Sequence, residues 1–343
     1  MRGLRWPAVI NAGRLRVGYA WSRFSRRPVM PISASPLALS IEPTTSCNLR
    51  CPECPSGLRS FTRPTGMLDV EMFKGLMNEI GPRLWYLNVY FQGEPLLHKG
   101  FEDIVRAARR HGIYVATSTN AHHITAERAA QLVECGLNRL VISIDGTDQA
   151  TYEQYRIGGK LDRVLEGSRR VMEAVNHASA KAIAEGGTRS QLSVVWQFLV
   201  TGVNEDQLEH VQSMARDAGV HRLEVKTAQL DDPRDGHPLL TIDPALRRYD
   251  RKADGQWELR NPMKNECRRM WESAVVTWDG RVVPCCFDKD ADHEMGRLNA
   301  DGSGFKKIWH SAGYAAFRQA IFQDRKSIEI CQNCTEGMQC HVN

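Results

Sequence analysis

Apolar residues follow two alternating patterns between residue 37 and about residue 227. Short runs rich in β-branched residues, typical of buried strands, occur at 37–41, 85–91, 113–117, 139–144, 192–200 and 222–226. Between them, apolar residues recur at helical spacing in four stripes: Met72, Phe73, Leu76, Met77 and Ile80; Phe101, Ile104, Val105 and Ala108; Ile124, Ala129, Leu132 and Val133; and Leu208, Val211, Met214 and Ala215. The repeated strand–helix order predicts an α/β fold with a parallel sheet, either open or curled into a partial barrel.

Three smaller features refine this pattern. The polar stretch 177–190, HASAKAIAEGGTRS, contains a Gly-Gly pair and is predicted to be a surface loop. Asn204 precedes the fourth helical stripe and is a candidate N-cap for that helix. Cys135 lies on the third stripe and is therefore expected to be a core thiol.

The pattern changes again after residue 265. Two β-branched runs, 275–277 and 281–283, flank Trp-Asp-Gly and predict a β-hairpin. Prolines at 28, 31 and 36 separate the first residues from the first predicted strand. We therefore expect four parts: an N-terminal segment (1–36), an α/β core (37–227), a bridging segment (228–262) and a small C-terminal domain (263–343).

The composition is typical of a globular protein, and the chain is long enough to form one large domain and a smaller one. The 343 residues are 42% hydrophobic and 25% charged, and no apolar run approaches the roughly 20 residues that span a bilayer. The ten cysteines gather at short spacings, which favours metal sites in a reducing compartment over a disulfide framework. We therefore expect a cytoplasmic protein.

Positive charge is concentrated at the N-terminus. Residues 1–36 hold seven arginines and no acid; without those seven, 38 basic residues face 40 acidic ones, so the rest of the chain does not call for nucleic acid. We expect this segment to be a helix packed on the outside of the core. The alternatives are a basic amphipathic helix on an anionic membrane or a partner, or a transit peptide. It lacks the continuous apolar region of a secretory signal.

Cys47, Cys51 and Cys54 follow the first predicted strand in one short loop, at spacing C-x3-C-x2-C. A closed structural zinc site takes four ligands, and no fourth Cys or His lies close by in the sequence. Three thiolates suit a [4Fe-4S] cluster whose fourth iron binds another group. A zinc loop completed by a distant residue is the alternative.

A second cysteine set surrounds the predicted hairpin. Cys267 precedes it, Cys285 ends it, and Cys331 and Cys334 form a later C-x2-C. Four thiolates can close around one centre, either an iron–sulfur cluster or a structural zinc.

The C-x3-C-x2-C loop after a first strand resembles the radical S-adenosylmethionine (SAM) superfamily, and the resemblance covers about residues 37–338. It implies a partial (β/α)6 barrel and a [4Fe-4S] cluster that is chelated by SAM. It also implies reductive cleavage of SAM to a 5′-deoxyadenosyl radical, which abstracts hydrogen from a substrate. A non-enzymatic scaffold that binds zinc or a cluster is the alternative from another class.

The second cysteine set resembles the SPASM/twitch module of the same superfamily, with Gly280 at the position of its glycine. A full SPASM module would need a further cysteine beyond Asn343. The resemblance therefore implies the twitch version, with one auxiliary [4Fe-4S] cluster held by the four cysteines named above. Cys286 and Cys340 are then expected to be non-ligands.

SAM contacts are implied at the ends of the second and third strands. Gln92, Gly93 and Glu94 resemble the superfamily's Gly-Gly-Glu segment, although Gln92 departs from the pattern. Ser118 and Asn120 fall where relatives carry Thr-Asn-Gly, with alanine here in place of the glycine.

The fourth strand supplies a further set of implied SAM contacts. Ser143 and Arg156 fit the pair that holds the SAM carboxylate in relatives with SPASM or twitch modules. A carboxylate gains from a guanidinium and a hydroxyl donor. Asp145 is either a ribose contact or a cap for the following helix.

The resemblance implies an oxidoreductase. A fully coordinated auxiliary cluster is suited to accept the electron left on a substrate radical, so we expect oxidation or cross-linking, with a reductant such as flavodoxin or ferredoxin. The 46 residues before Cys47 are short and arginine-rich for a peptide-recognition domain, which favours a small molecule or carbohydrate over a peptide. Specificity is expected in 228–262; the sequence identifies no catalytic acid or base.

Overall fold

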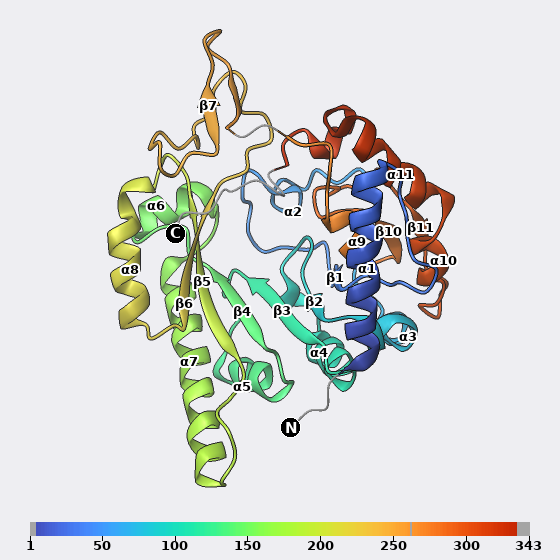
Figure 1. The fold of residues 1–343 in the computed structure, drawn as a ribbon. Coiled ribbons are helices and arrows are strands. Elements are labelled where there is room, and N and C mark those ends of the chain that lie inside the picture. Colours follow the sequence, from blue (N-terminus) through green and yellow to red (C-terminus); the bar gives the residue numbers. More distant parts are fainter. Residues whose placement is uncertain (1–4, 261–262, 335–343) are drawn as a thin grey trace. The chain divides into compact units, whose positions relative to one another are not determined.

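The computed structural model describes residues 5–260 and 263–334, which form two compact units. Of the described residues, unit 1 comprises 5–46, 61–115 and 263–334. Unit 2 comprises 47–60 and 116–260. Each unit is described by itself below (Figure 1).

The sheet of unit 1 joins the first strands of the chain to the C-terminal hairpin. Its strands are β1 (Ala38–Ile41), β2 (Tyr86–Asn88), β9 (Ser273–Val276), β10 (Arg281–Val283) and β11 (Gly296–Arg297). β1 pairs in parallel with both β2 and β9, and β10 pairs antiparallel with β9 and β11. The predicted hairpin is confirmed by β9 and β10. It joins the sheet because β9 pairs with β1.

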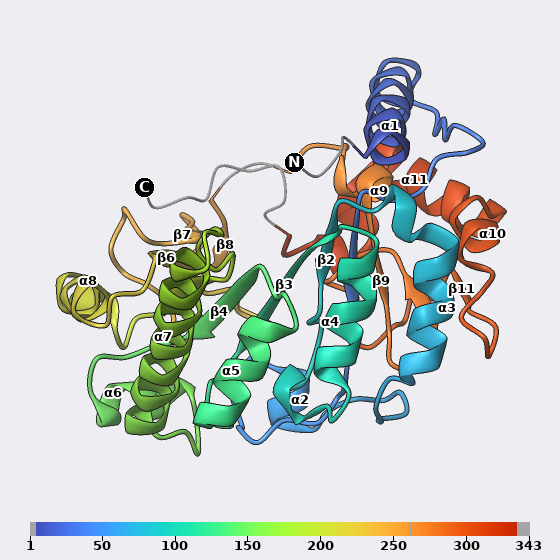
Figure 2. The ribbon, with the colours of Figure 1, turned by 90° about the horizontal axis from the view of Figure 1, so that it is seen from below.

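Two helices of unit 1, α3 (Val70–Ile80) and α4 (Phe101–Arg110), bury the predicted apolar stripes. The other helices of the unit are α1 (Trp6–Ser25), α9 (Arg269–Glu272), α10 (Phe305–Trp309) and α11 (Ala312–Asp324), with 3-10 turns η1 (Gly81–Arg83), η2 (Pro95–Leu97), η4 (Arg325–Ser327) and η5 (Glu329–Cys331) (Figure 2). The Trp85 indole Nε1, from the core, donates to the Ala8 carbonyl of α1 at 2.9 Å. The expected packing of the N-terminal helix on the core is therefore confirmed.

Unit 2 contains a parallel sheet and a separate hairpin. Its strands are residues 116–119 of β3 (Tyr114–Thr119), β4 (Arg139–Ser143), β5 (Ser193–Val200) and β6 (Arg222–Thr227), paired in that order. Its helices are α2 (Pro55–Leu58), α5 (Ala126–Glu134), α6 (Gln149–Tyr155), α7 (Leu161–Ala184) and α8 (Leu208–Asp217), with the 3-10 turn η3 (Glu205–Gln207). β7 (Tyr249–Arg251) and β8 (Trp257–Leu259) form the antiparallel hairpin within the bridging segment.

All six predicted strands are present, and the parallel α/β class is confirmed. Two local expectations were wrong. Residues 177–184 continue α7 instead of forming a loop, because HASAKAIA is rich in alanine and carries its helix propensity past the apolar stripe. Asn204 does not cap α8; its side chain amide donates to the carbonyl oxygens of Asp145 and Leu199. Cys135 is buried in the core, as expected.

Within the described residues, no helix is long and apolar enough to cross a membrane.

Helix α3 packs backbone against backbone on the turn before α10. A Cβ atom at Gly75 would lie 1.7 Å from the carbonyl oxygen of Asp301, and a Cβ at Gly302 would lie 1.9 Å from that of Met72. Only glycine at both positions permits this approach.

We predict that Gly75→Ala destabilises the fold by about 3 kcal/mol or more, although alanine favours helices, because the added methyl group meets backbone that cannot turn away. Gly13→Ala in α1 is the matched control, since nothing lies within 4 Å of its Cβ position. It should be neutral or raise stability by up to about 1 kcal/mol. Denaturant unfolding of both variants measures the difference; equal effects would contradict the prediction.

Candidate functional site

The three thiols of the C-x3-C-x2-C loop lie in one cluster of unit 2. Cys51 is buried, and Cys47 and Cys54 pack half-buried against the same cluster. The remaining buried members come from the loop itself, from α6 and from the bridging segment: Leu49, Tyr155, Ala228, Leu230, Leu239 and Tyr249. The loop therefore packs among apolar side chains, and four of the buried ones come from residues 228–262.

Backbone contacts fix the shape of this loop. The Leu49 amide donates to the Cys47 sulfur at 3.4 Å, and the Cys54 amide donates to the Cys51 carbonyl at 3.3 Å. Helix α2 follows directly, and a Cβ at its Gly57 would lie 2.6 Å from the Cys51 backbone. The close approach of α2 therefore holds the middle of the motif.

Arg156 directs a positive charge at the loop. Its Nη1 donates to the Cys51 sulfur at 3.6 Å, and its Nε donates to Asp145 Oδ2 at 2.5 Å. Burial raises the pKa of the Cys51 thiol, and the Arg156 guanidinium opposes that rise. Arg156 thus stabilises a thiolate at Cys51 relative to the thiol.

Asp145 holds Arg156 in this position. Its other carboxylate oxygen accepts from the Leu199 amide at 2.8 Å, so both oxygens are engaged in a fully buried site. The cap of α6 is instead Asp148, which accepts from the Thr151 amide at 2.9 Å. The capping alternative for Asp145 was therefore wrong.

Asn120 is a second residue that the fold brings to the loop. Its side chain amide donates to Asn48 Oδ1 at 2.8 Å and lies 4.0 Å from the Cys47 sulfur. Ser118 lies near the carboxyl end of β3, and Ser143 is the buried last residue of β4. The SAM-contacting roles of these three residues stay predictions.

Glu53, within the motif, was missed by sequence reasoning. One of its carboxylate oxygens accepts from the Asp231 amide at 2.7 Å, and the other lies 3.1 Å from His237 Nε2. The sequence signal was an acidic residue between two cysteines of the motif. The partners of Glu53 are about 180 residues away in the sequence, so the signal could not identify them. These contacts tie the bridging segment to the cysteine loop.

The Gln92–Glu94 segment lies in unit 1, against the residues that lead into Cys47. Gly93 has φ +73°, and a Cβ there would lie 2.2 Å from the Thr44 carbonyl oxygen, so the turn requires glycine. The Glu94 amide donates to the Ser46 carbonyl at 2.8 Å, and Gln92 is buried. Their roles in SAM binding stay predictions.

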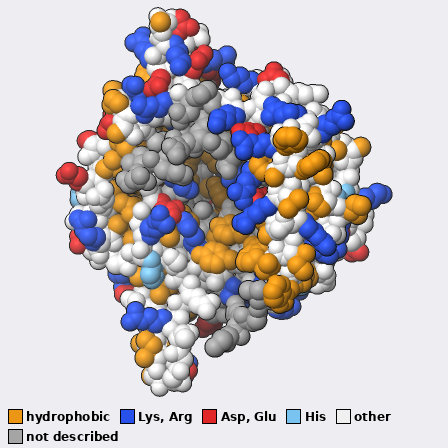
Figure 3. Space-filling model, in the orientation of Figure 1, with side chains coloured by type: hydrophobic (Ala, Val, Ile, Leu, Met, Phe, Trp, Pro, Cys, Tyr) orange, Lys and Arg blue, Asp and Glu red, His pale blue; other side chains and the backbone are white. Residues whose placement is uncertain are grey.

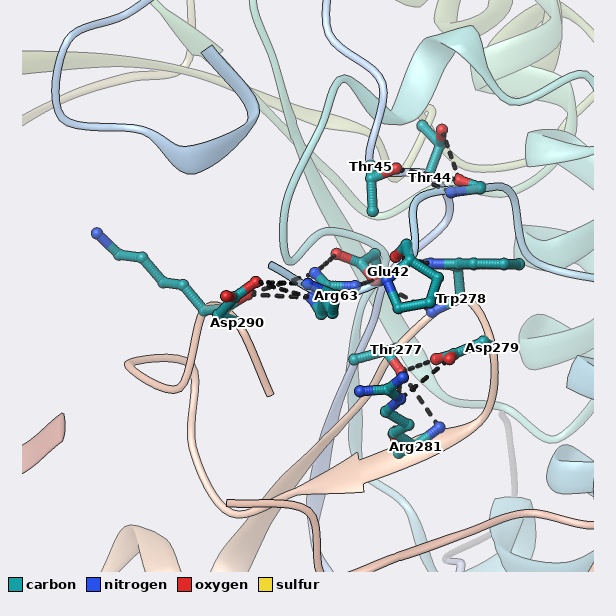
Figure 4. Close-up of polar contacts among 12 residues, drawn as sticks. Glu42, Thr44, Thr45, Arg63, Thr277, Trp278, Asp279, Arg281 and Asp290 are labelled. Atoms are coloured by element: carbon teal, nitrogen blue, oxygen red, sulfur yellow. Dashed lines mark hydrogen bonds and ion pairs between the residues drawn. The ribbon is translucent and has the colours of Figure 1, made fainter. Parts of the chain in front are cut away.

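Unit 1 contains a buried ion pair between two residues that precede and follow the C-x3-C-x2-C motif in the sequence (Figure 4). Arg63 donates from both terminal nitrogens to the two oxygens of Glu42, at 2.9 and 2.6 Å. The two side chains are 2% and 0% exposed. Burial raises the pKa of Glu42, and the Arg63 guanidinium opposes that rise.

The C-terminal domain bonds to the same pair. The Trp278 amide, in the hairpin turn, donates to Glu42 Oε2 at 3.2 Å. The Asp290 carboxylate accepts from the Thr62 amide at 2.9 Å and from the Thr62 hydroxyl, as well as from the Arg63 amide at 3.4 Å. The segment that leaves the cysteine loop is therefore fixed by residues of the cysteine-rich C-terminus.

The second cysteine set comes together within unit 1. Cys267, Cys285 and Cys331 pack on one apolar cluster, and Arg325 Nη2 donates to the Cys334 sulfur at 3.1 Å. Burial alone would lower the pKa of Arg325, but Cys267, Cys334 and Cys331 raise it above its ordinary value. Burial raises the pKa of Cys331 to about 11. Arg325 thus lies beside three of the four predicted ligands.

Cys286 lies in a different environment. It packs with another apolar cluster, which contains Val275 and Val283, and its sulfur accepts from Arg269 Nη1 at 2.9 Å. Cys286 also interacts with the neighbouring Cys285, and its expected role as a non-ligand stays a prediction. Cys340 lies outside the described residues.

The donor chemistry of both sets fits iron–sulfur clusters. Each set brings thiols, with a guanidinium close by, into an apolar surrounding, as such clusters require of their ligands. Within the described part of the chain, no three Cys, His, Asp or Glu side chains converge on the position of a single metal ion. The thiolates of a [4Fe-4S] cluster each bind a different iron and are spread more widely.

Comparison with known families and proteins agrees with this geometry. Residues 41–184 match the model of the radical SAM superfamily, and residues 267–335 match that of the SPASM iron–sulfur cluster-binding domain. The chain is 30% identical over 328 residues to the mycofactocin maturase MftC of Mycolicibacterium smegmatis, covering 89% of this chain and 77% of that protein.

Two solved structures share the fold. SuiB of Streptococcus suis bound to its precursor peptide SuiA has a TM-score of 0.61 at 14% identity, covering 94% of this chain and 75% of that one. BtrN in complex with AdoMet and 2-DOIA has a TM-score of 0.52 at 20% identity, covering 88% and 94%.

The fold and the two cysteine sets define an iron–sulfur enzyme with a parallel α/β core. The chain belongs to the radical SAM superfamily and carries a SPASM domain. An enzyme of this kind takes a [4Fe-4S] cluster that binds SAM, and its SPASM domain binds auxiliary iron–sulfur clusters.

We predict that Arg156→Lys weakens SAM binding by at least about tenfold, because an ammonium group cannot bond both Asp145 and a carboxylate with the planar fork of arginine. Calorimetric titration of the reconstituted protein with SAM, without oxygen, measures the change. Arg139→Lys is the matched control, since Arg139 in β4 also pairs with a carboxylate, that of Glu224, at 2.6 Å. Equal affinities of the Arg156→Lys and Arg139→Lys variants for SAM would refute the prediction that Arg156 binds the SAM carboxylate.

We predict that Glu42→Gln lowers the free energy of unfolding by about 3–5 kcal/mol, because it leaves Arg63 charged and buried without its partner. Denaturant unfolding measures the loss. Glu71→Gln, which breaks the exposed pair with Lys74, is the control and should cost at most about 1 kcal/mol. The prediction fails if the two substitutions have the same effect.

Proposed function

We propose that this radical SAM enzyme oxidises or cross-links its substrate with help from one auxiliary [4Fe-4S] cluster. The main support for this proposal is that one chain contains both cysteine sets, each with an arginine beside its thiols. The proposed ligands are Cys47, Cys51 and Cys54 for the first cluster, and Cys267, Cys285, Cys331 and Cys334 for the second.

When bound, the first cluster and SAM supply the reducing electron and the 5′-deoxyadenosyl radical that removes a hydrogen atom from the substrate. The residues of the chain bind and orient these groups. The proposed partner of the SAM carboxylate is Arg156, which Asp145 holds, and Asn120 steadies the start of the cysteine loop through Asn48. The apolar cluster around the loop excludes water from the reacting centre.

The bridging segment is the proposed source of specificity. It packs on the cysteine loop through Leu230, Leu239 and Tyr249, and its Asp231 and His237 contact Glu53. A substrate held by this segment would lie close to the first cluster. Function in the cytoplasm, with flavodoxin or ferredoxin as reductant, is part of the same proposal.

A peptide is the first substrate class to test. SuiB, which shares the fold over most of this chain, is known in complex with a precursor peptide, and MftC is a maturase. A small molecule, which the sequence favoured together with a carbohydrate, is the second class. BtrN, of nearly the same extent, is known in complex with 2-DOIA.

We predict about eight irons per chain in protein purified without oxygen, and about four in the Cys47/Cys51/Cys54→Ala variant. With SAM and a reductant, only the wild-type chain should form 5′-deoxyadenosine. Cys286→Ala is the matched control and should keep the full iron content. Zinc in place of iron in both proteins, without 5′-deoxyadenosine, would refute the proposal and favour a non-enzymatic scaffold.

A further inference from the structure

Helix α1 has two opposite faces, and most of its large apolar side chains lie on the outer one. The face packed on the rest of unit 1 carries one large apolar residue, Leu15, among small or polar residues at spacings of three and four: Ala8, Asn11, Gly18 and Ser22. The outer face carries Trp6, Ile10, Val17, Trp21 and Phe24. Their spacings of four, seven, four and three residues place them along one line of the helix.

This distribution is the reverse of an ordinary surface helix, which buries its large apolar side chains. On the outer face, Trp21 is 60% exposed, Val17 70% and Phe24 84%. Among the described residues, seven of the fifteen large hydrophobic side chains that are exposed fall between residues 6 and 32. Such a concentration marks a surface that another body covers.

The inner face is built for close packing. A Cβ at Gly18 would lie 2.8 Å from Pro31 Cδ, and Ser22 Oγ accepts from the Val29 amide at 2.7 Å. Trp85 Nε1 donates to the Ala8 carbonyl at 2.9 Å. These contacts fix the rotation of the helix, so the aromatic face stays turned outward.

Positive charge borders the apolar line. Arg14 and Arg16 are exposed beside it, and Arg23 and Arg27 are exposed toward the end of the helix, with no acid anywhere in residues 1–36. Figure 3 shows hydrophobic side chains running along α1, with lysine and arginine side chains on both sides. Arg23 Nε also pairs with Glu266 Oε2 at 2.5 Å, and 60% of the Arg23 side chain remains exposed.

We propose that α1 docks the enzyme on the surface of a membrane that contains anionic lipids. Charge complementarity favours this occupant, because the line of tryptophan, phenylalanine and aliphatic side chains fits the acyl boundary while the flanking arginines meet phosphate headgroups. The helix lies in the plane of the surface and does not cross it. This proposal stands independently of the reaction and its substrate.

Co-sedimentation with vesicles tests the proposal. Reconstituted wild-type protein should bind vesicles of phosphatidylcholine with about one third phosphatidylglycerol, and bind pure phosphatidylcholine much more weakly. Added salt should weaken the binding. The variant Trp21→Asp/Phe24→Asp should bind at least about tenfold more weakly, because burial of two aromatic side chains is lost.

Ile183→Asp/Ile242→Asp is the matched control, since both side chains are exposed and belong to segments other than α1. It should bind vesicles as the wild type does, and both variants should keep the iron content and melting temperature. Failure of the wild type to bind, or equal binding by the outer-face variant, would overturn the proposal. So would a dimer that the outer-face substitutions dissociate without any vesicle binding, which would assign the face to a second copy of the chain.

Discussion

The buried ion pair of Glu42 and Arg63 is the interaction on which the rest of unit 1 depends. It closes a segment of chain that contains all three cysteines of the C-x3-C-x2-C motif, and the backbones of 43–45 and 66–68 pair beside it. Two charges without water are tolerated only as partners, so neither side of the closure is stable alone. Trp278 and Asp290 bond to these residues, so within unit 1 the C-terminal domain holds the segments that precede and follow the first motif in the sequence.

Each cysteine set combines apolar enclosure with a fixed guanidinium. Arg156 lies at Cys51 because Asp145 holds it, and Arg325 lies at Cys334 because its Nη1 also donates to the Glu266 carbonyl at 3.0 Å. Burial opposes ionisation of the thiols, and the cations offset part of that cost. Hydrogen bonds to cluster sulfurs also influence reduction potential, so with the proposed cysteine ligands these arginines would act on both cluster binding and redox chemistry.

The two faces of helix α1 differ, because one packs within unit 1 and the other is exposed. Its inner face carries a glycine at residue 18, where the segment at Pro31 approaches closely. Its outer face carries the aromatic residues that such a helix would ordinarily bury. The composition of residues 1–36 suggested both a packed helix and a surface-binding helix, and the fold accommodates both on opposite sides.

The sequence by itself determined the order of strands and helices, the two cysteine sets and the hairpin at Gly280, because each rests on local spacing or on a backbone conformation that few residues adopt. Local signals could not assign Asp145 or Glu53, whose partners Leu199 and Asp231 are distant in the sequence. Nor could they show that β9 pairs with β1, or that Arg63 is buried against Glu42. Only the tertiary structure decided these, since burial and pairing of charges depend on which distant segments pack together.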